Sequence, residues 1–275
     1  MCIRDREWTD LTDLDAARDA ITPDTALVWI ETPSNPLLRI TDIAGVCELA
    51  HTVGARVLAD NTFCSPLLQQ PLTLGADVVM HSTTKFINGH SDVVGGALVT
   101  GDDQIAEQLS WWLNTTGVGA ASFDSWLQLR GLRTLEARLA IHQRNTAAIL
   151  PVLLTHEAVA AVHHPSLPEH PGHAIAARQQ RGFGSLLSFE LVGGRTAVDA
   201  LVRDLTCFDL AESLGGVESL VVHPRSMTHA AMSAEALELA GIGEGLLRLS
   251  IGIEGADDLV ADLKAGLDRA ARSAG

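Results

Sequence analysis

Two polar segments of this chain contain residue types that can support covalent cofactor chemistry. Asp60 ends a buried strand-like run, and the segment His81–Lys85 follows further along the chain. A lysine amine on a rigid turn can form a Schiff base with a carbonyl group, and a strand-end carboxylate can keep a pyridinium nitrogen protonated. The hydroxyls of Ser82 and Thr84 could bind a phosphate beside Lys85. Spacing alone leaves ordinary roles open, because Lys85 could be a solvated cation and Asp60 a loop cap.

The surrounding pattern predicts that a largely parallel sheet positions these segments. Strand-like runs and helical patterns alternate, as βαβ units do. Strands are expected at 26–31, 56–60, 77–81 and 95–100, with a helix at 42–53. A right-handed crossover would place the first two strands side by side. Ligands bind at the carboxyl ends of such strands, so Asn35, Asp60 and the Ser82–Lys85 turn are expected at one rim.

The second half of the chain predicts a smaller α/β domain. A helical pattern at 123–154 includes a long connector, and the proline-containing stretch 163–173 is expected to form an exposed loop. Strands are expected at 185–192, 218–222 and 246–251, with helices at 196–203 and 256–272. We therefore expect a cofactor-binding domain over 1–138 and a C-terminal domain over 139–275.

The composition excludes several classes of protein. Hydrophobic residues make up 47% and charged residues 19% of the 275 residues, which is typical of a globular protein. A formal net charge of −15 argues against nucleic-acid binding. No apolar run of membrane-spanning length and no signal peptide is present, and the four cysteines form no CxxC pair. We expect a cytoplasmic protein with no membrane partner, and no metal site, because the histidines of the proline-containing stretch lack ligand spacing.

Six motifs in order carry a resemblance to a known family. They are Glu-Thr-Pro-Ser-Asn-Pro at 31–36, Ala-Asp-Asn-Thr-Phe at 59–63, His-Ser-Thr-Thr-Lys-Phe-Ile-Asn-Gly-His-Ser-Asp at 81–92, Ala-Glu-Ser-Leu-Gly-Gly-Val-Glu-Ser at 211–219, Met-Thr-His-Ala at 227–230 and Leu-Arg-Leu-Ser-Ile-Gly-Ile-Glu at 247–254. The chain resembles the Cys/Met-metabolism (trans-sulfuration) family of pyridoxal-phosphate enzymes over roughly residues 20–270. The resemblance implies a fold-type I, aspartate-aminotransferase-like α/β fold and pyridoxal 5'-phosphate as cofactor.

The resemblance also implies roles for individual residues around the cofactor. Lys85 would bind the cofactor covalently and later move protons. Asp60 would pair with the pyridinium nitrogen, while Ser82 and Thr84 would contact the phosphate.

A second group of residues would bind the substrate. Arg248 would hold its α-carboxylate, a task that suits the bidentate guanidinium fork, and Asn35 and the main chain at Ser213 would complete that site. Glu212 would lie beside the substrate and favour a cationic amino group on an incoming thiol. From the residues alone, Arg248 could equally form a strand-end salt bridge and Glu212 could be an exposed turn carboxylate.

The reaction that the resemblance implies is a γ-replacement on an O-acylated homoserine. We expect O-succinylhomoserine as the ester and cysteine as the thiol, giving cystathionine. Two alternatives within the family share every quoted motif: γ-elimination from cystathionine, and sulfhydrylation of a homoserine ester. An alternative of another class is an inactive fragment that only associates with other subunits. The family resemblance also implies a homotetramer built from dimers.

The chain departs from the family pattern at its start. The phosphate-binding glycine loop, the cofactor-stacking tyrosine and the N-terminal arm expected of the family are absent, and the chain contains no tyrosine at all. Residues 1–6 match nothing expected and could be non-native. We therefore expect low activity from the 275-residue chain alone.

Overall fold

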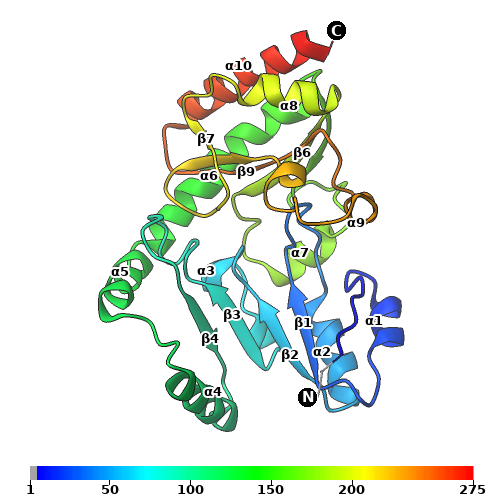
Figure 1. Ribbon diagram of the computed structural model, residues 1–275, viewed down its shortest axis with the longest axis vertical. Helices are drawn as coiled ribbons and strands as arrows, with labels where there is room; N and C mark the ends of the chain where they lie inside the picture. The colour runs from blue at the N-terminus through cyan, green and yellow to red at the C-terminus, as the bar shows by residue number, and fades with distance from the viewer. Residues whose placement is uncertain (1–4, 275) are drawn as a thin grey trace.

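The computed structural model describes residues 5–274 and contains two sheets joined by a long helix (Figure 1). The helices are α1 (Leu14–Ala20), α2 (Ile43–Thr52), α3 (Ser65–Leu68), α4 (Asp103–Thr116), α5 (Ser122–Leu132), α6 (Leu135–Thr155), α7 (His173–Gln179), α8 (Gly194–Val202), α9 (Ala234–Ala240) and α10 (Ala256–Ala274). The strands are β1 (Leu27–Glu31), β2 (Arg56–Asp60), β3 (Val78–Ser82), β4 (Gly96–Val99), β5 (Val159–His163), β6 (Leu186–Leu191), β7 (Phe208–Leu210), β8 (Ser219–Val222) and β9 (Leu246–Ser250). The prediction that residues 1–6 could be non-native concerns a segment of which residues 1–4 lie outside the described range.

The first sheet has the strand order β1-β2-β3-β4. Strands β1, β2 and β3 run parallel, and β4 is antiparallel to β3, which confirms the mostly parallel sheet and the adjacency of the first two strands. Glu31 and Asp60 are register partners at the carboxyl ends of β1 and β2. Helix α2 covers one face, where Ile43, Val46 and Val57 are fully buried.

The second sheet has the order β5-β6-β9-β8-β7, in which only β7 and β8 pair in parallel. Its main hydrophobic core includes residues of α6, α8 and α10. In Figure 1 these helices lie together at the top of the molecule, with α10 beside α8. Strand β9 is buried along its whole length, so Arg248 in its middle is held inside the protein.

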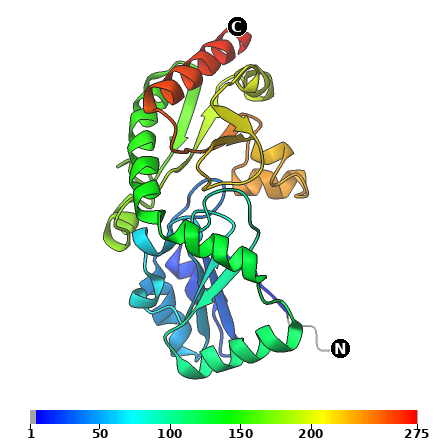
Figure 2. The same ribbon diagram turned by 90° about the vertical axis from the view of Figure 1, so that its left-hand side faces the viewer.

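The long helical pattern expected at 123–154 divides in two, because α5 ends at Leu132 and α6 begins at Leu135. Figure 2 shows α6 running from the first sheet to the second. The expected boundary at 138/139 falls inside α6, so the two-domain division stays a prediction. The buried side chains of Phe86 and Leu139 belong to a core cluster that joins both halves of the molecule beside the Lys85 turn.

The expected loop at 163–173 is shorter than predicted. Strand β5 ends at His163 and helix α7 begins at His173. Several elements were not predicted: α1, α3, α4, β5, α7, β7 and α9. Among the described residues, no helix is both long and apolar enough to cross a lipid bilayer.

Candidate active site

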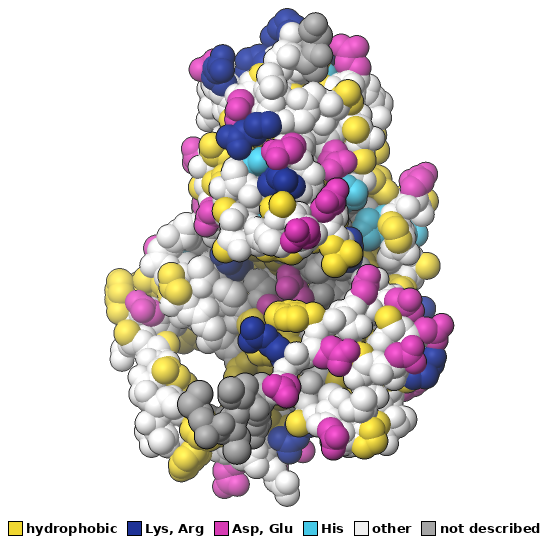
Figure 3. Space-filling model, turned by 45° about the vertical axis from the view of Figure 1, so that its right-hand side comes forward, with side chains coloured by type: hydrophobic (Ala, Val, Ile, Leu, Met, Phe, Trp, Pro, Cys, Tyr) yellow, Lys and Arg dark blue, Asp and Glu magenta, His cyan; other side chains and the backbone are white. Residues whose placement is uncertain are grey.

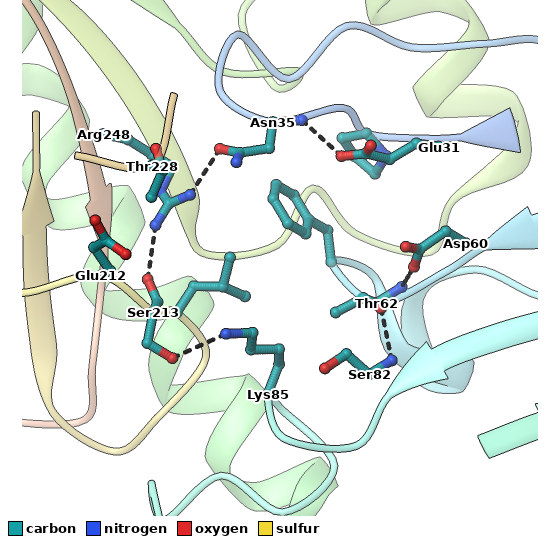
Figure 4. A pocket seen from close by; sticks show the side chains of 13 residues that line it. Glu31, Asn35, Asp60, Thr62, Ser82, Lys85, Glu212, Ser213, Thr228 and Arg248 are labelled. Carbon is teal, nitrogen blue, oxygen red and sulfur yellow. Dashed lines mark hydrogen bonds between the residues drawn. The ribbon is translucent and has the colours of Figure 1, made fainter. Parts of the chain in front are cut away.

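A cavity of about 380 Å³ lies where the carboxyl ends of the first sheet meet the second half of the chain. Its lining residues come from six segments far apart in the sequence: Glu31, Pro33, Asn35, Asp60, Thr62, Phe63, Ser82, Lys85, Glu212, Ser213, Leu214, Thr228 and Arg248. Seven of the eight residues expected in the site therefore line one cavity, and Figure 4 shows Lys85 directed towards Ser213 while Asp60 lies on the other side.

The Lys85 side chain projects from a tight turn that follows β3. The turn is closed by the Lys85 N–H, which donates to the Ser82 carbonyl (3.2 Å), and by the Gly89 N–H, which donates to the Lys85 carbonyl (2.8 Å). The Lys85 Nζ donates to the Ser213 Oγ at 3.0 Å. Burial, and then the positive charge of Arg248, lower the pKa of Lys85. Both causes favour the neutral, nucleophilic amine.

Arg138, which was not predicted as a site residue, holds the outer side of this turn. It reaches in from α6 and is almost fully buried. Its guanidinium donates to the carbonyls of Phe86 (2.8 Å), Ile87 (3.3 Å) and Gly131 (2.9 Å). The local sequence gave no signal for this role, because the partners of Arg138 in the Lys85 turn, the carbonyls of Phe86 and Ile87, are backbone groups about fifty residues away.

The segment around Ser213 reaches Lys85 because a glycine allows close backbone approach. Gly215 has φ +76°, and a Cβ at this position would lie 2.9 Å from the Phe86 backbone nitrogen. The Gly215 N–H also donates to the Ser250 Oγ (2.8 Å), which ties the segment to β9. A residue with a side chain would push Ser213 away from the cavity.

Arg248 is held by two partners that also line the cavity. Its Nη1 donates to the Asn35 Oδ1 and its Nη2 donates to the Ser213 carbonyl, each at 2.7 Å. The Nε is buried without a hydrogen-bond partner among the described residues. Burial lowers the pKa of Arg248 to about 10, and the nearby Glu212 carboxylate opposes this shift. The guanidinium is thus fixed in direction and retains an unpaired donor, as expected for an anion-binding group.

Asp60 and the hydroxyl groups lie on the other side of the cavity. The Asp60 Oδ1 accepts from the Thr62 N–H (2.9 Å), and the Thr62 Oγ1 accepts from the Ser82 N–H (2.9 Å) (Figure 4). Thr62 belongs to the motif at 59–63 and was not predicted as a site residue, yet it joins the ends of β2 and β3. Its position after Asp60 was the only signal for this role.

Thr84 is the expected site residue that does not line the cavity. Its hydroxyl donates to the Gly95 carbonyl (3.2 Å) and accepts from the Gly95 N–H (3.0 Å). The hydroxyl thus bridges the Lys85 turn to the residue before β4. The expected phosphate contact of Thr84 stays a prediction, and Ser82 is the hydroxyl-bearing residue of the pair that lines the cavity.

The donor set of the cavity fits pyridoxal phosphate. An amine with a lowered pKa, a strand-end carboxylate and a hydroxyl at Ser82 are the groups that its aldehyde, ring nitrogen and phosphate require. The buried Arg248, whose Nε has no hydrogen-bond partner among the described residues, adds a guanidinium to this lining. Within residues 5–274 no cluster of three or more His, Cys, Asp or Glu side chains could hold a metal ion.

Comparisons with known proteins agree with this geometry. Residues 3–268 match the family described as "Cys/Met metabolism PLP-dependent enzyme". The chain is 54% identical over 259 residues to cystathionine gamma-synthase of Escherichia coli K12, covering 94% of this chain and 67% of that protein. It is 47% identical over 262 residues to cystathionine gamma-lyase of Dictyostelium discoideum, covering 95% of this chain and 68% of that protein.

A solved structure also matches closely. The crystal structure of cystathionine gamma synthase from Xanthomonas oryzae pv. oryzae, in complex with aminoacrylate and cysteine, has a TM-score of 0.95 and 60% identity, with 96% of this chain and 68% of that chain covered. The present chain therefore spans about two thirds of the length of these relatives. The chain belongs to the Cys/Met metabolism family of pyridoxal-phosphate-dependent enzymes.

Proposed function

We propose that this chain forms the larger part of an enzyme that replaces the γ-substituent of an O-acylated homoserine, with O-succinylhomoserine as the ester, by cysteine. The product is cystathionine. The observation that carries the proposal is the convergence of Lys85, Asp60 and Arg248 on one cavity in a chain that resembles cystathionine gamma-synthases. Pyridoxal phosphate, when bound, supplies an electron sink for the carbanions of this reaction.

Three of the lining residues would hold the cofactor. Lys85 would bind it covalently through Nζ, and Asp60 would hold its ring nitrogen in the protonated form. Ser82 would donate to its phosphate. The lowered pKa of Lys85 supports this role, since the neutral amine is the reactive form.

A second group of lining residues would bind and orient the amino-acid substrate. The Arg248 guanidinium would bind the α-carboxylate, and Asn35 and the Ser213 carbonyl hold that guanidinium in place. Lys85 Nζ would then take a proton from Cα and, after passing that proton on, one from Cβ, and both carbons regain a proton before the product leaves. The ester C–O bond at Cγ breaks, the cysteine sulfur forms a bond to Cγ, and the thiol proton leaves with the carboxylate as the carboxylic acid. Glu212, which lines the same cavity, would attract the amino group of the incoming cysteine.

The synthase reaction is favoured over the lyase reaction by degree of similarity. The two synthases named above are 54% and 60% identical to this chain, while the Dictyostelium lyase is 47% identical. The lyase reaction stays the second candidate, because the same motifs fit both reactions. We further propose a cytoplasmic location and a homotetramer.

A product assay tests the proposal. The protein, saturated with pyridoxal phosphate, is incubated with O-succinylhomoserine and cysteine, and cystathionine and succinate are quantified. A parallel reaction with cystathionine alone measures release of cysteine and ammonia. Cystathionine formation faster than its breakdown supports the synthase, whereas breakdown without formation would replace it with the lyase.

A further inference from the structure

Glu31 is an ionisable residue of the cavity to which no role has yet been given. It is the last residue of β1 and the register partner of Asp60 on β2. Its Oε1 accepts a hydrogen bond from the backbone N–H of Asn35 at 3.0 Å. Figure 4 shows Glu31 and Asn35 on the side of the cavity opposite Lys85.

The contact joins Glu31 to the proposed carboxylate site through a single residue. The side chain of Asn35 accepts from Arg248 Nη1 at 2.7 Å, while its backbone donates to Glu31. Glu31 therefore holds one end of a residue whose other end orients the guanidinium. A shift of the Asn35 backbone would remove one of the two bonds that aim Arg248.

The rest of the 32–41 loop is held independently of Glu31. The Ser34 N–H donates to the Arg39 carbonyl (3.0 Å), and the Ser188 hydroxyl donates to the Pro36 carbonyl (2.6 Å). Loss of the Glu31 carboxylate should thus loosen Asn35 and leave its neighbours in place. The expected effect is local and is not an unfolding of the loop.

The charge surroundings show what stabilises the ionised Glu31. Within residues 5–274, no Lys, Arg or His side chain forms an ion pair with it. Burial, and to a lesser degree Asp60, raise the pKa of the carboxyl, and the Asn35 N–H opposes this shift. Glu31 is nevertheless exposed, at the end of the face of β1 that also exposes Leu27 and Trp29, and it lines the cavity. The Asn35 N–H is thus the specific contact that favours the carboxylate.

We propose that Glu31 is a positioning residue for substrate recognition: it fixes the Asn35 backbone so that the Asn35 side chain orients Arg248 towards the substrate carboxylate. This inference rests on the proposed function, because it requires a substrate that carries a carboxylate. Glu31 itself forms no bond with that carboxylate.

Two variants separate the hydrogen-bond acceptor from the charge. Glu31→Gln keeps an oxygen acceptor for the Asn35 N–H, and Glu31→Ala removes it. The cofactor-loaded protein is titrated with glycine, which carries a carboxylate, and with methylamine, which does not, and binding is measured by calorimetry. For glycine we expect Glu31→Ala to raise Kd by roughly ten-fold, the loss of a hydrogen bond to a charged group. Glu31→Gln should raise it by only about three-fold, because neutral acceptors retain part of that bond.

The Kd for methylamine distinguishes the proposed role from general damage to the site, because general damage would raise this Kd and loss of the proposed role would not. Its Kd should be unchanged in both variants. Equal weakening of glycine and methylamine binding, or no weakening of glycine binding by Glu31→Ala, would overturn the proposal. Because Asn35 is the proposed link, Glu31→Ala should add nothing to the effect of Asn35→Ala on glycine binding, and full additivity would also overturn it.

A matched control removes another carboxylate that holds backbone N–H groups. Asp262 accepts from the N–H groups of Thr206 and Cys207 at the opposite end of the molecule from the first sheet. Asp262→Ala should leave glycine binding unchanged. Glycine binding requires no γ-replacement, so a protein that binds glycine as expected but forms no cystathionine would reject the proposed function and leave the role of Glu31 standing.

Discussion

At the residue scale, the reactivity of Lys85 depends on its distance from water and from Arg248. Burial is the larger cause of its lowered pKa and the Arg248 charge is the second. Only the neutral amine attacks a carbonyl group, so a lowered pKa makes Lys85 reactive at a lower pH than an exposed lysine. The chain contains just one other lysine, Lys264 on α10, which provides an internal reference for labelling.

We predict that removing the Arg248 charge shifts cofactor capture to higher pH. In Arg248→Met one cause of the lowered pKa is lost, so the pKa of Lys85 rises and the neutral fraction at pH 7 falls. The rate of pyridoxal phosphate capture, followed by visible absorbance against pH, should rise with its midpoint at higher pH than in the wild type. Borohydride reduction and peptide mapping should label Lys85 in both proteins, and Lys264→Gln should leave labelling intact. An unshifted midpoint would contradict the coupling.

Asp60 lends itself to an equally direct prediction. Asp60→Asn keeps a polar side chain for the Thr62 N–H but removes the negative charge that would hold the ring nitrogen protonated. We expect the variant to retain cofactor but to lose turnover by orders of magnitude. Steady-state kinetics at equal cofactor occupancy, measured by absorbance, would check this. A kcat within a few-fold of the wild type would exclude the proposed role.

At the element scale, the site depends on turns that bring distant segments into contact. Asn35, Asp60 and Lys85 follow three neighbouring parallel strands, which is why a pattern of strands could predict their common rim. The approach of Ser213 and Arg248 from the second sheet could not be predicted from local patterns. It depends on Gly215 fitting against Phe86 and on hydrogen bonds between side chains more than a hundred residues apart in the sequence.

The same distinction explains the elements and residues that were missed. Helix α4 buries only Ile105, so its sequence lacks the core-facing stripe that identifies an amphipathic helix. Arg138 and Thr84 act on carbonyl and N–H groups, which carry no sequence signal. The motifs predicted which residues gather in the cavity, and the backbone decides which of their polar atoms remain available. Thr84 is an example, because its hydroxyl donates to the Gly95 carbonyl and accepts from the Gly95 N–H.

We predict that Gly215→Ala uncouples the Ser213 segment from the Lys85 turn. The added Cβ would lie 2.9 Å from the Phe86 nitrogen at φ +76°. Gly117→Ala is the matched control, because φ is +69° there but no atom lies within 4 Å. The control should cost about 1 kcal/mol in the free energy of unfolding from the backbone conformation. Gly215→Ala should cost a further ~1–3 kcal/mol from overpacking.

Urea denaturation measures both costs, and retention of cofactor during gel filtration measures the site. Gly215→Ala should lose cofactor because Ser213 no longer reaches the Lys85 Nζ, whereas Gly117→Ala should retain it. Equal destabilisation in the two variants would show that the close approach to Phe86 is not a constraint.

At the scale of the whole molecule, the first sheet presents apolar side chains on its uncovered face. Leu27 and Trp29 on β1 are 50% and 56% exposed, and Leu98 on β4 is 49% exposed. Helices α4 and α5 expose further large side chains, among them Trp111, Trp112, Phe123 and Trp126. Figure 3 shows hydrophobic side chains in a recess of the lower half of the molecule. Parallel sheets are normally covered on both faces, so this surface is typical of one that packs against further protein.

We predict that the 275-residue chain alone forms cystathionine slowly, if at all, and that additional polypeptide at its N-terminus restores turnover. About a third of the length of the relatives has no counterpart in this chain. Glu31 lies on the same exposed face of β1 as Leu27 and Trp29, and it also lines the cavity, so this face of the sheet borders the cavity. Protein packed on that face would close the cavity and exclude water from it, which strengthens the electrostatic contacts of Lys85, Asp60 and Arg248. The chain as given and a version extended with the corresponding segment of the Escherichia coli relative are compared at equal cofactor occupancy. The extended protein should bind less of a hydrophobic dye and form cystathionine faster. Equal dye binding and equal turnover would show that the uncovered face is not a packing surface and that the cavity is complete within residues 5–274.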